Sequence, residues 1–229
     1  FRRVLFRSRK GYVAPRGRAP EVKPAAGDPT RAAAAEVIAS PLPVSGLRMS
    51  VSAAPFKGSA PNATIALAIE FAGSDFTLVE KDGTFNGRLE VSFIATDING
   101  KTFPGERHGV NLTMKPDTYE RMKTQGFRVV SQLDLPPGRY QMRIAAADNA
   151  RAGSVLYDLE VPDFYKAPVA MSGITLTSGS ASLTPTVAPK DTFADALPAP
   201  RSTRREFARG EELALFAEFY ENEIGRAHV

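Results

Sequence analysis

The stretch LPPGRYQMRIAAADNARAGSVLYDLEVPDF, residues 135–164, decides the fold class of this chain. Two runs in it, Tyr140 to Ala146 and Val155 to Val161, alternate between apolar and other side chains. Such a period of two is typical of strands that bury one face. The Pro137-Gly138 corner precedes the first run, and Asp148 to Gly153 turns the chain between the two. The stretch therefore predicts two antiparallel neighbours in a sheet.

Five further runs upstream show the same alternation. They are residues 47–53, 64–71, 89–96, 110–114 and 127–135. Turn signals stand between strands, including Lys81-Asp82-Gly83 and Asn99-Gly100. Seven short strands in about 120 residues predict an all-β fold. We expect an immunoglobulin-like antiparallel β-sandwich over residues 46–165.

Two short helices and two linkers flank or interrupt this pattern. Asp28 is placed to cap a helix that runs to Ile38. Pro116 to Gln125 is predicted to form a helix in a connection between strands, ended by Gly126. The Pro- and Gly-rich residues 9–45 are predicted to be a linker at the end of an upstream domain. Residues 166–203 are predicted to be a second linker, rich in Pro, Ser, Thr and Ala.

Residues 204–222 are predicted to be the first strand of a truncated second β domain. One face of this strand would carry Leu213, Leu215, Ala217 and Phe219. Because a strand needs neighbours, we expect either poor order from about residue 185 or pairing with an exposed sandwich edge. One more strand is expected over Met171–Leu176.

The two ends of the chain are related to each other. One coding of RVLFRS, residues 3–8, encodes EIGRAHV, residues 223–229, when it is read on the opposite strand. This oligonucleotide resembles a sequencing adapter. We therefore expect residues 1–8 and 223–229 to be adapter-derived and to contribute nothing to the fold.

Composition restricts the available chemistry. The chain has no Cys, which excludes a thiolate metal site and a disulfide scaffold. It has only two His, which gives little basis for a Ser-His-Asp triad. The net charge is +4, yet residues 40–165 hold 13 Lys and Arg against 14 Asp and Glu. A nucleic-acid-binding protein needs a basic face on its folded body, so we expect no nucleic-acid partner. No run reaches the length of about 18 apolar residues that a transmembrane segment requires.

Four residues are singled out for structural roles: Tyr140, Gly138, Pro137 and Gly100. Tyr140 follows the Pro137-Gly138 corner by two residues, which favours a tyrosine corner over a ligand contact. Its ring would lie in the core and its hydroxyl would bond to nearby backbone. Gly100 completes the Asn-Gly turn.

Oxygen-rich turns and one histidine are the other candidates for chemistry. Asp97 with Asn99, and Asp148 with Asn149, carry oxygens that suit calcium. An EF-hand-like loop that starts at Asp97 would need Glu at its twelfth position, where His108 stands, so turn chemistry is favoured. His108 is expected to be an exposed loop residue. We predict no catalytic, cofactor-binding or metal-ligating residue, no cofactor and no enzymatic activity.

Several longer motifs carry a resemblance to a known family. They are RKGYVAP (9–15), SPLPVSGLRMSVSAAPFKG (40–58), EKDG (80–83), LPPGRYQMRIAAAD (135–148), GSVLYDLEVPDF (153–164) and REFARGEELALFAEFY (205–220). Their order and spacing resemble the region downstream of the von Willebrand factor A-type domain in secreted VWFA-related bacterial proteins of acidobacterial type. The resemblance implies an extracytoplasmic protein, secreted or on the cell surface, with a von Willebrand A-type domain upstream. The Asp-x-Ser-x-Ser adhesion motif of that domain does not occur here, so no metal site is carried over.

Three functions are compatible with this sequence. The first is a non-catalytic interaction or spacer module of a secreted VWFA-related protein, which orients the upstream domain and has an unknown protein partner. The alternatives are an accessory β-sandwich of a secreted hydrolase and a carbohydrate-binding sandwich. The lack of Trp counts against the carbohydrate platform, as does the position of most Phe and Tyr on predicted inward faces.

Overall fold

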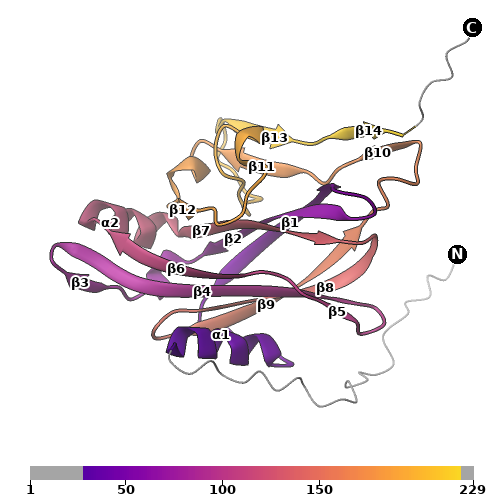
Figure 1. Ribbon diagram of the computed structural model, residues 1–229. Helices are drawn as coiled ribbons and strands as arrows, with labels where there is room; N and C mark the ends of the chain where they lie inside the picture. Colours follow the sequence, from indigo (N-terminus) through magenta and orange to yellow (C-terminus); the bar gives the residue numbers. More distant parts are fainter. Residues whose placement is uncertain (1–27, 223–229) are drawn as a thin grey trace, which may run out of the picture.

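Two curled sheets face each other across a shared core in the computed structural model, which describes residues 28–222 (Figure 1). The chain is mostly β, as expected. The segments predicted to be adapter-derived, and the start of the first predicted linker, lie outside the described residues. Each of the seven expected runs corresponds to a strand, although the first run starts at Leu47, two residues before its strand. The strands are β1 (Met49–Lys57), β2 (Ala63–Phe71), β4 (Thr84–Asp97), β6 (Arg107–Met114), β7 (Phe127–Leu135), β8 (Gly138–Ala147) and β9 (Ala152–Val161).

The first sheet is built around the long strand β4. It pairs with β6 and β8 over eight residues each and with the short strands β3 (Val79–Lys81) and β5 (Thr102–Phe103). β9 completes this sheet by pairing with β8, as the hairpin motif predicted. The second sheet has the order β1-β2-β7-β12. Its last member, β12 (Thr186–Val187), is a two-residue parallel addition, and the other strand pairs are antiparallel.

The core lies between the two sheets and uses the apolar faces that the alternation predicted. These side chains are removed from water, and each contributes roughly 1.5–3 kcal/mol to folding. Fully buried members are Ile65, Leu67 and Ile69 of β2, Leu89 and Val91 of β4, Val129 of β7, and Met142 and Ile144 of β8.

Both predicted helices are confirmed, as α1 (Pro29–Ala39) and α2 (Pro116–Gln125). Asp28 caps α1 by accepting hydrogen bonds from two backbone N–H groups. α1 packs on the outer face of the first sheet, against β4, β8 and β9. Gly126 ends α2 with φ 85°, and a Cβ there would lie 2.6 Å from the Phe71 carbonyl oxygen. Within the part of the chain that the structure describes, no helix combines the length and apolar character needed to cross a membrane.

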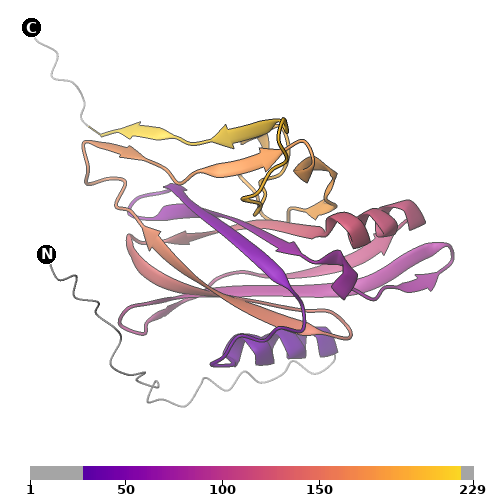
Figure 2. The same cartoon turned by 180° about the vertical axis from the view of Figure 1, so that it is seen from behind.

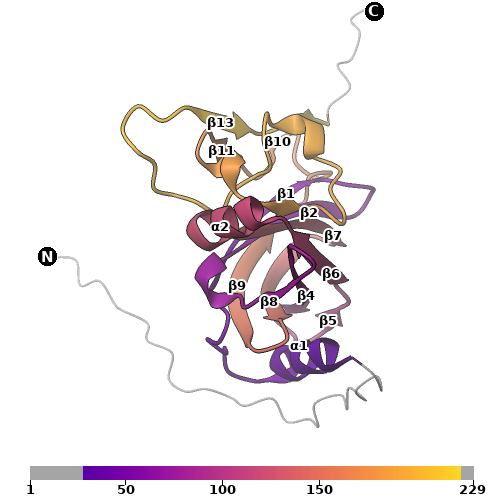
Figure 3. The same ribbon diagram turned by 90° about the vertical axis from the view of Figure 1, so that its left-hand side faces the viewer.

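Residues 166–222 form a third layer on the outer face of the second sheet, opposite α1 (Figures 2 and 3). Two strand pairs, β10–β14 and β11–β13, make a two-stranded ribbon. Between β11 and β13, the chain crosses the outer face of the second sheet as loops and 3₁₀ turns. The elements are β10 (Val169–Met171), β11 (Thr175–Ser178), η2 (Ala181–Leu183), η3 (Ala194–Ala196), β13 (Leu213–Phe216) and β14 (Phe219–Glu221).

This layer differs from the expectations in two ways. The strand expected over Met171–Leu176 is interrupted, because the Gly173 N–H donates to the Pro55 carbonyl at 2.6 Å instead of joining the ribbon. The strand expected in residues 204–222 neither lacks a partner nor joins a sandwich edge. It forms β13 and β14, which pair with β11 and β10.

The second sheet is consequently covered on both faces. Alternate positions of β1, β2 and β7 were expected to face solvent, and that prediction was wrong for Ser52, Ala66, Ala68, Arg128 and Gln132, which are buried. The third layer covers them. Phe56 of β1 shows the packing, since its ring lies 4.5 Å from that of Phe193 and 5.6 Å from that of Phe216.

Candidate functional site

The contact between the third layer and the second sheet holds two buried arginines. Arg128 lies on the outer face of β7 and is fully buried, and Arg201 lies in the segment before β13 and is 5% exposed. Each has a carboxylate partner: Glu70 for Arg128 and Asp191 for Arg201. We name these four residues the arginine joint.

Arg128 connects β7 to two separate parts of the third layer. Its Nε donates to Glu70 Oε1 at 2.7 Å within the sheet. Its Nη2 and Nη1 donate to the carbonyls of Ala181 and Pro200 at 2.9 and 3.1 Å. A planar guanidinium suits this task because it presents five donors in a fixed geometry.

Glu70 also bonds to the third layer. Its two oxygens accept hydrogen bonds from the hydroxyls of Ser202 and Thr203 at 2.9 and 2.8 Å. Burial alone would raise the pKa of Glu70, but the Arg128 charge and these hydroxyls outweigh burial and hold the pKa below its ordinary value. Glu70 is therefore ionised at neutral pH, and its carboxylate accepts hydrogen bonds from both the second sheet and the third layer.

Arg201 reaches from the third layer onto the backbone of the second sheet. Its Nη1 donates to Asp191 Oδ1 at 2.6 Å, and its Nη2 donates to the carbonyls of Ser131 and Leu67 at 2.8 and 3.3 Å. Burial lowers the pKa of Arg201, and the Asp191 carboxylate opposes that shift. Removing one partner of such a buried pair typically costs about 3–5 kcal/mol, because the other charge is left uncompensated.

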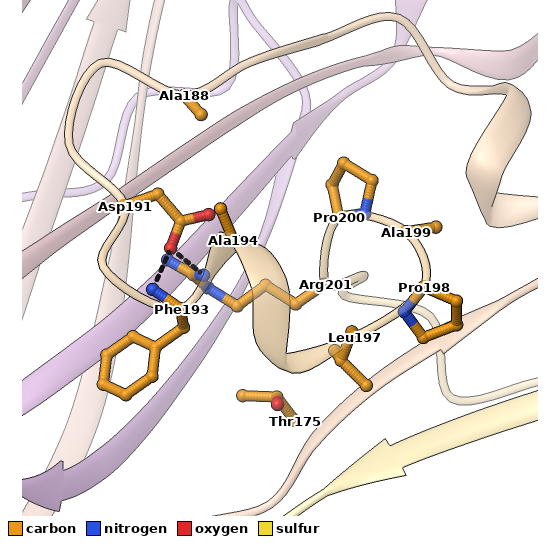
Figure 4. Close-up of a pocket in the computed structure, with 10 residues that line it drawn as sticks. All are labelled: Thr175, Ala188, Asp191, Phe193, Ala194, Leu197, Pro198, Ala199, Pro200 and Arg201. Atoms are coloured by element: carbon orange, nitrogen blue, oxygen red, sulfur yellow. Dashed lines mark hydrogen bonds and ion pairs between the residues drawn. The ribbon is translucent and has the colours of Figure 1, made fainter.

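A cavity of about 210 Å³ lies beside this second pair (Figure 4). The Arg201 guanidinium reaches across it to Asp191, whose carboxylate also accepts the Phe193 N–H at 3.0 Å. The two charges are thus turned toward each other, which favours a structural role over ligand capture. The lining residues are Thr175, Ala188, Asp191, Phe193, Ala194, Leu197, Pro198, Ala199, Pro200 and Arg201.

The N-terminal helix is anchored on the opposite face by polar contacts as well. Asp28 forms an ion pair with Arg88 of β4 at 2.8 Å. Arg143 of β8 donates to the carbonyl of Ile38 at 2.9 Å, at the other end of α1. Ala34 and Val37 of α1 are buried. Both chain segments that flank the sandwich are therefore attached to it, on opposite sides.

The predicted structural residues lie at one end of the sandwich. Tyr140 is 5% exposed, and its hydroxyl donates to the Pro136 carbonyl at 2.8 Å. Burial raises the pKa of this hydroxyl, with a smaller contribution from Asp97. A Cβ on Gly138 would lie 3.3 Å from that hydroxyl oxygen, so the corner after Pro137 leaves little room for a side chain.

The oxygen-rich turns use their oxygens on their own backbone. Asp97 Oδ1 accepts the N–H groups of Asn99 and Lys101, both at 2.9 Å, and Gly100 supplies φ 84° to the turn. Asp148 Oδ1 accepts the N–H groups of the two residues after Asn149, at 2.8 and 2.6 Å. Within residues 28–222, no group of three or more His, Asp and Glu side chains is arranged to hold a metal ion.

His108 is not the exposed loop residue that we expected. It lies within β6 and is half-buried, with its Nε2 2.8 Å from Ser131 Oγ of β7. Burial lowers the pKa of His108, so its ring stays neutral at physiological pH. The expectation failed because β6 begins at Arg107, three residues before the first apolar residue of the alternating run.

Sequence reasoning did not find the arginine joint. Arg128 occupies a nominally polar position of an alternating strand, which ordinarily means solvent. The available signal was Val130, an apolar residue on the same side of β7, together with the alanines at positions 66 and 68 of β2. Apolar residues on both sides of a strand indicate burial of both faces.

Comparison with known proteins gives no match, either to a protein-family model or to a curated protein. The function is therefore argued from the site and the sequence.

Proposed function

We propose that this chain is a non-catalytic interaction or spacer module of a secreted VWFA-related protein, built on an immunoglobulin-like sandwich. The observation that carries the spacer role is the anchoring of both flanking segments. α1 is fixed to the first sheet, and residues 166–222 are fixed to the second. A spacer sets the direction of what precedes and follows it only if both connections are stiff.

The arginine joint supplies this stiffness on the C-terminal side. The Arg128 side chain donates from the second sheet to carbonyls of the third layer, and the Arg201 side chain donates from the layer to a carbonyl of β7. The layer therefore cannot slide without breaking several charge-assisted hydrogen bonds. The resemblance to VWFA-related proteins adds the upstream partner and the extracytoplasmic location. In this proposal a von Willebrand A-type domain precedes α1 and performs the recognition.

The test is a distance measurement between the two anchored segments. Two cysteines are introduced at exposed positions, Glu36→Cys on α1 and Leu183→Cys in η2. Because the chain has no Cys of its own, a thiol-reactive nitroxide attaches at these two positions alone. Pulsed electron paramagnetic resonance should give one narrow distance distribution. A broad distribution, as from a flexible linker, would contradict the spacer role.

A matched pair of variants connects that result to the joint. Asp191→Asn removes the negative charge that pairs with the buried Arg201 guanidinium and should broaden the distance distribution. Asp195→Asn changes an exposed carboxylate four residues further along and should leave it unchanged. Equal behaviour of the two variants would show that the joint does not hold the layer.

A further inference from the structure

The chain contains two Asn-Gly pairs, and the structure places them in different surroundings. Asn99-Gly100 lies in the turn that joins β4 to β5, and both of its residues are exposed (Figure 1). Asn86-Gly87 lies within β4 and is half-buried. Asparagine is one of the less durable side chains of proteins, and a following glycine lets backbone and side chain approach closely. The two pairs therefore present the same reactive sequence in two settings.

The exposed pair has room to react. Among residues 28–222, no hydrogen bond holds the Asn99 side-chain amide, and a Cβ built on Gly100 would have no heavy atom within 4 Å. The main restraint on the nitrogen of Gly100 is its own turn, where its N–H donates to the Asp97 carbonyl at 3.0 Å. A single hydrogen bond at an exposed loop tip opens far more readily than a core strand. The Gly100 nitrogen can therefore reach the neighbouring amide without unfolding of the sandwich.

The second pair is held in place on all sides. The Asn86 Nδ2 donates to the Thr84 carbonyl and hydroxyl at 3.1 and 2.9 Å, and its Oδ1 accepts the Thr113 hydroxyl at 3.1 Å. A Cβ on Gly87 would collide with the Leu78 side chain, so this glycine is enclosed. Both residues are also paired with β6 in the first sheet. Reaction at this pair requires β4 and β6 to separate.

We propose that Asn99 is a site of spontaneous deamidation. The nitrogen of Gly100 loses its proton and bonds to Asn99 Cγ, and the Cγ–Nδ2 bond breaks to release ammonia. Both reacting groups belong to adjacent residues, so the step is intramolecular. Its product is a succinimide ring that includes the Gly100 nitrogen. Water opens this ring at either carbonyl carbon, which gives aspartate or isoaspartate and restores the N–H. The sum is one water consumed and one ammonia released.

Deamidation changes the charge and the geometry at this end of the sandwich. The new carboxylate lies two residues from Asp97, whose Oδ1 accepts the N–H groups of Asn99 and Lys101, both at 2.9 Å. Like charges this close repel each other. Isoaspartate also lengthens the backbone between β4 and β5, which disturbs their pairing. We therefore expect the modification to loosen β5, whose Phe103 packs against Tyr140.

Peptide mapping of the whole chain tests this proposal, which is independent of the spacer role. The folded protein is kept in heavy-oxygen water and then digested with trypsin in ordinary water. Heavy oxygen then marks only what reacted in the folded protein. Trypsin cleaves after Lys81, Arg88 and Lys101, so Asn86 and Asn99 fall in separate peptides. Fragment spectra assign each exchange of amide nitrogen for heavy oxygen to its residue. We expect the labelled fraction at Asn99 to exceed that at Asn86 at least about tenfold.

A denatured sample and two matched variants separate structure from sequence. In urea both pairs lose their surroundings, and their labelled fractions should agree within about threefold. Asn99→Gln keeps an amide but needs a larger ring, so labelling at this position should fall at least about tenfold. Asn86→Gln should leave the labelling of Asn99 unchanged. Equal labelling of Asn86 and Asn99 in the folded protein would overturn the proposal. So would an unlabelled Asn99 in the folded protein under conditions that label it in urea.

Discussion

Tyr140 shows what one residue contributes to the end of the sandwich. Its ring packs edge-on against that of Phe103, with the ring centroids 5.4 Å apart, and its hydroxyl donates a hydrogen bond to the Pro136 carbonyl. Tyr140→Phe should lower the free energy of unfolding by about 1 kcal/mol, the net value of one hydrogen bond. Tyr140→Ala should cost roughly 3–5 kcal/mol, because it also empties a core position. Urea denaturation measures both.

Tyr157 provides the control for that series. It is a partly buried tyrosine packed against the same core, and no hydrogen bond to its hydroxyl is found among the described residues. Tyr157→Phe should therefore be close to neutral. If Tyr140→Ala proved as mild as Tyr157→Phe, the corner would not depend on Tyr140.

At the same scale, the arginine joint shows the limit of reading single positions. Arg128 and Gln132 have the residue types and the spacing of a solvated strand face. Their burial depends on residues 53–72 positions further along the chain, at Ala181, Thr192 and Pro200. No local pattern contains that information, because a guanidinium is compatible with water and with a fully paired interior alike.

At the scale of elements, α1 is a short helix whose stability depends on its ends. Asp28→Ala removes both the cap and the ion pair to Arg88 and should destabilise the protein by about 1–2 kcal/mol. Asp28→Asn keeps a capping oxygen and loses only a partly exposed ion pair, so its cost should be below about 1 kcal/mol. Thermal melts separate the two, and equal losses would show that the cap contributes nothing.

The elements that sequence predicted best are those with local signals. Asp28-Pro29 and Pro116 mark the starts of the two helices, and Gly126 marks an end, through caps and backbone limits that act within one turn. The strand expected over Met171–Leu176 fared worse. Its interruption comes from Pro55, a residue more than 100 positions away.

At the scale of the whole molecule, the third layer should be needed by the sandwich that it covers. Truncation after Tyr165 exposes Phe56 and removes the two carbonyls bound by Arg128. We expect a loss of roughly 3–6 kcal/mol in the free energy of unfolding, from one aromatic burial and several hydrogen bonds. Urea denaturation and binding of a hydrophobic dye measure the loss and the newly exposed face.

A second truncated variant keeps this prediction decisive if the first aggregates. Phe56→Ser in the truncated chain should recover solubility, because it removes the largest apolar side chain on the uncovered face. A truncated chain with the stability of the parent would support the predicted boundary at residue 165. The layer would then be an independent neighbour of the sandwich.

The sequence by itself determined the all-β class, the seven long strands, the inward faces of the core strands and both helices. Those features follow from the alternation of apolar side chains and from caps, which act between near neighbours. The tertiary structure alone decided that residues 166–222 fold back onto the second sheet. It also decided that Arg128 and Arg201 are buried there and that the ribbon leaves Leu215 and Phe219 outside. A segment with two apolar sides, such as β13 and β14, buries whichever side meets a complementary surface, and that surface belongs to distant parts of the chain.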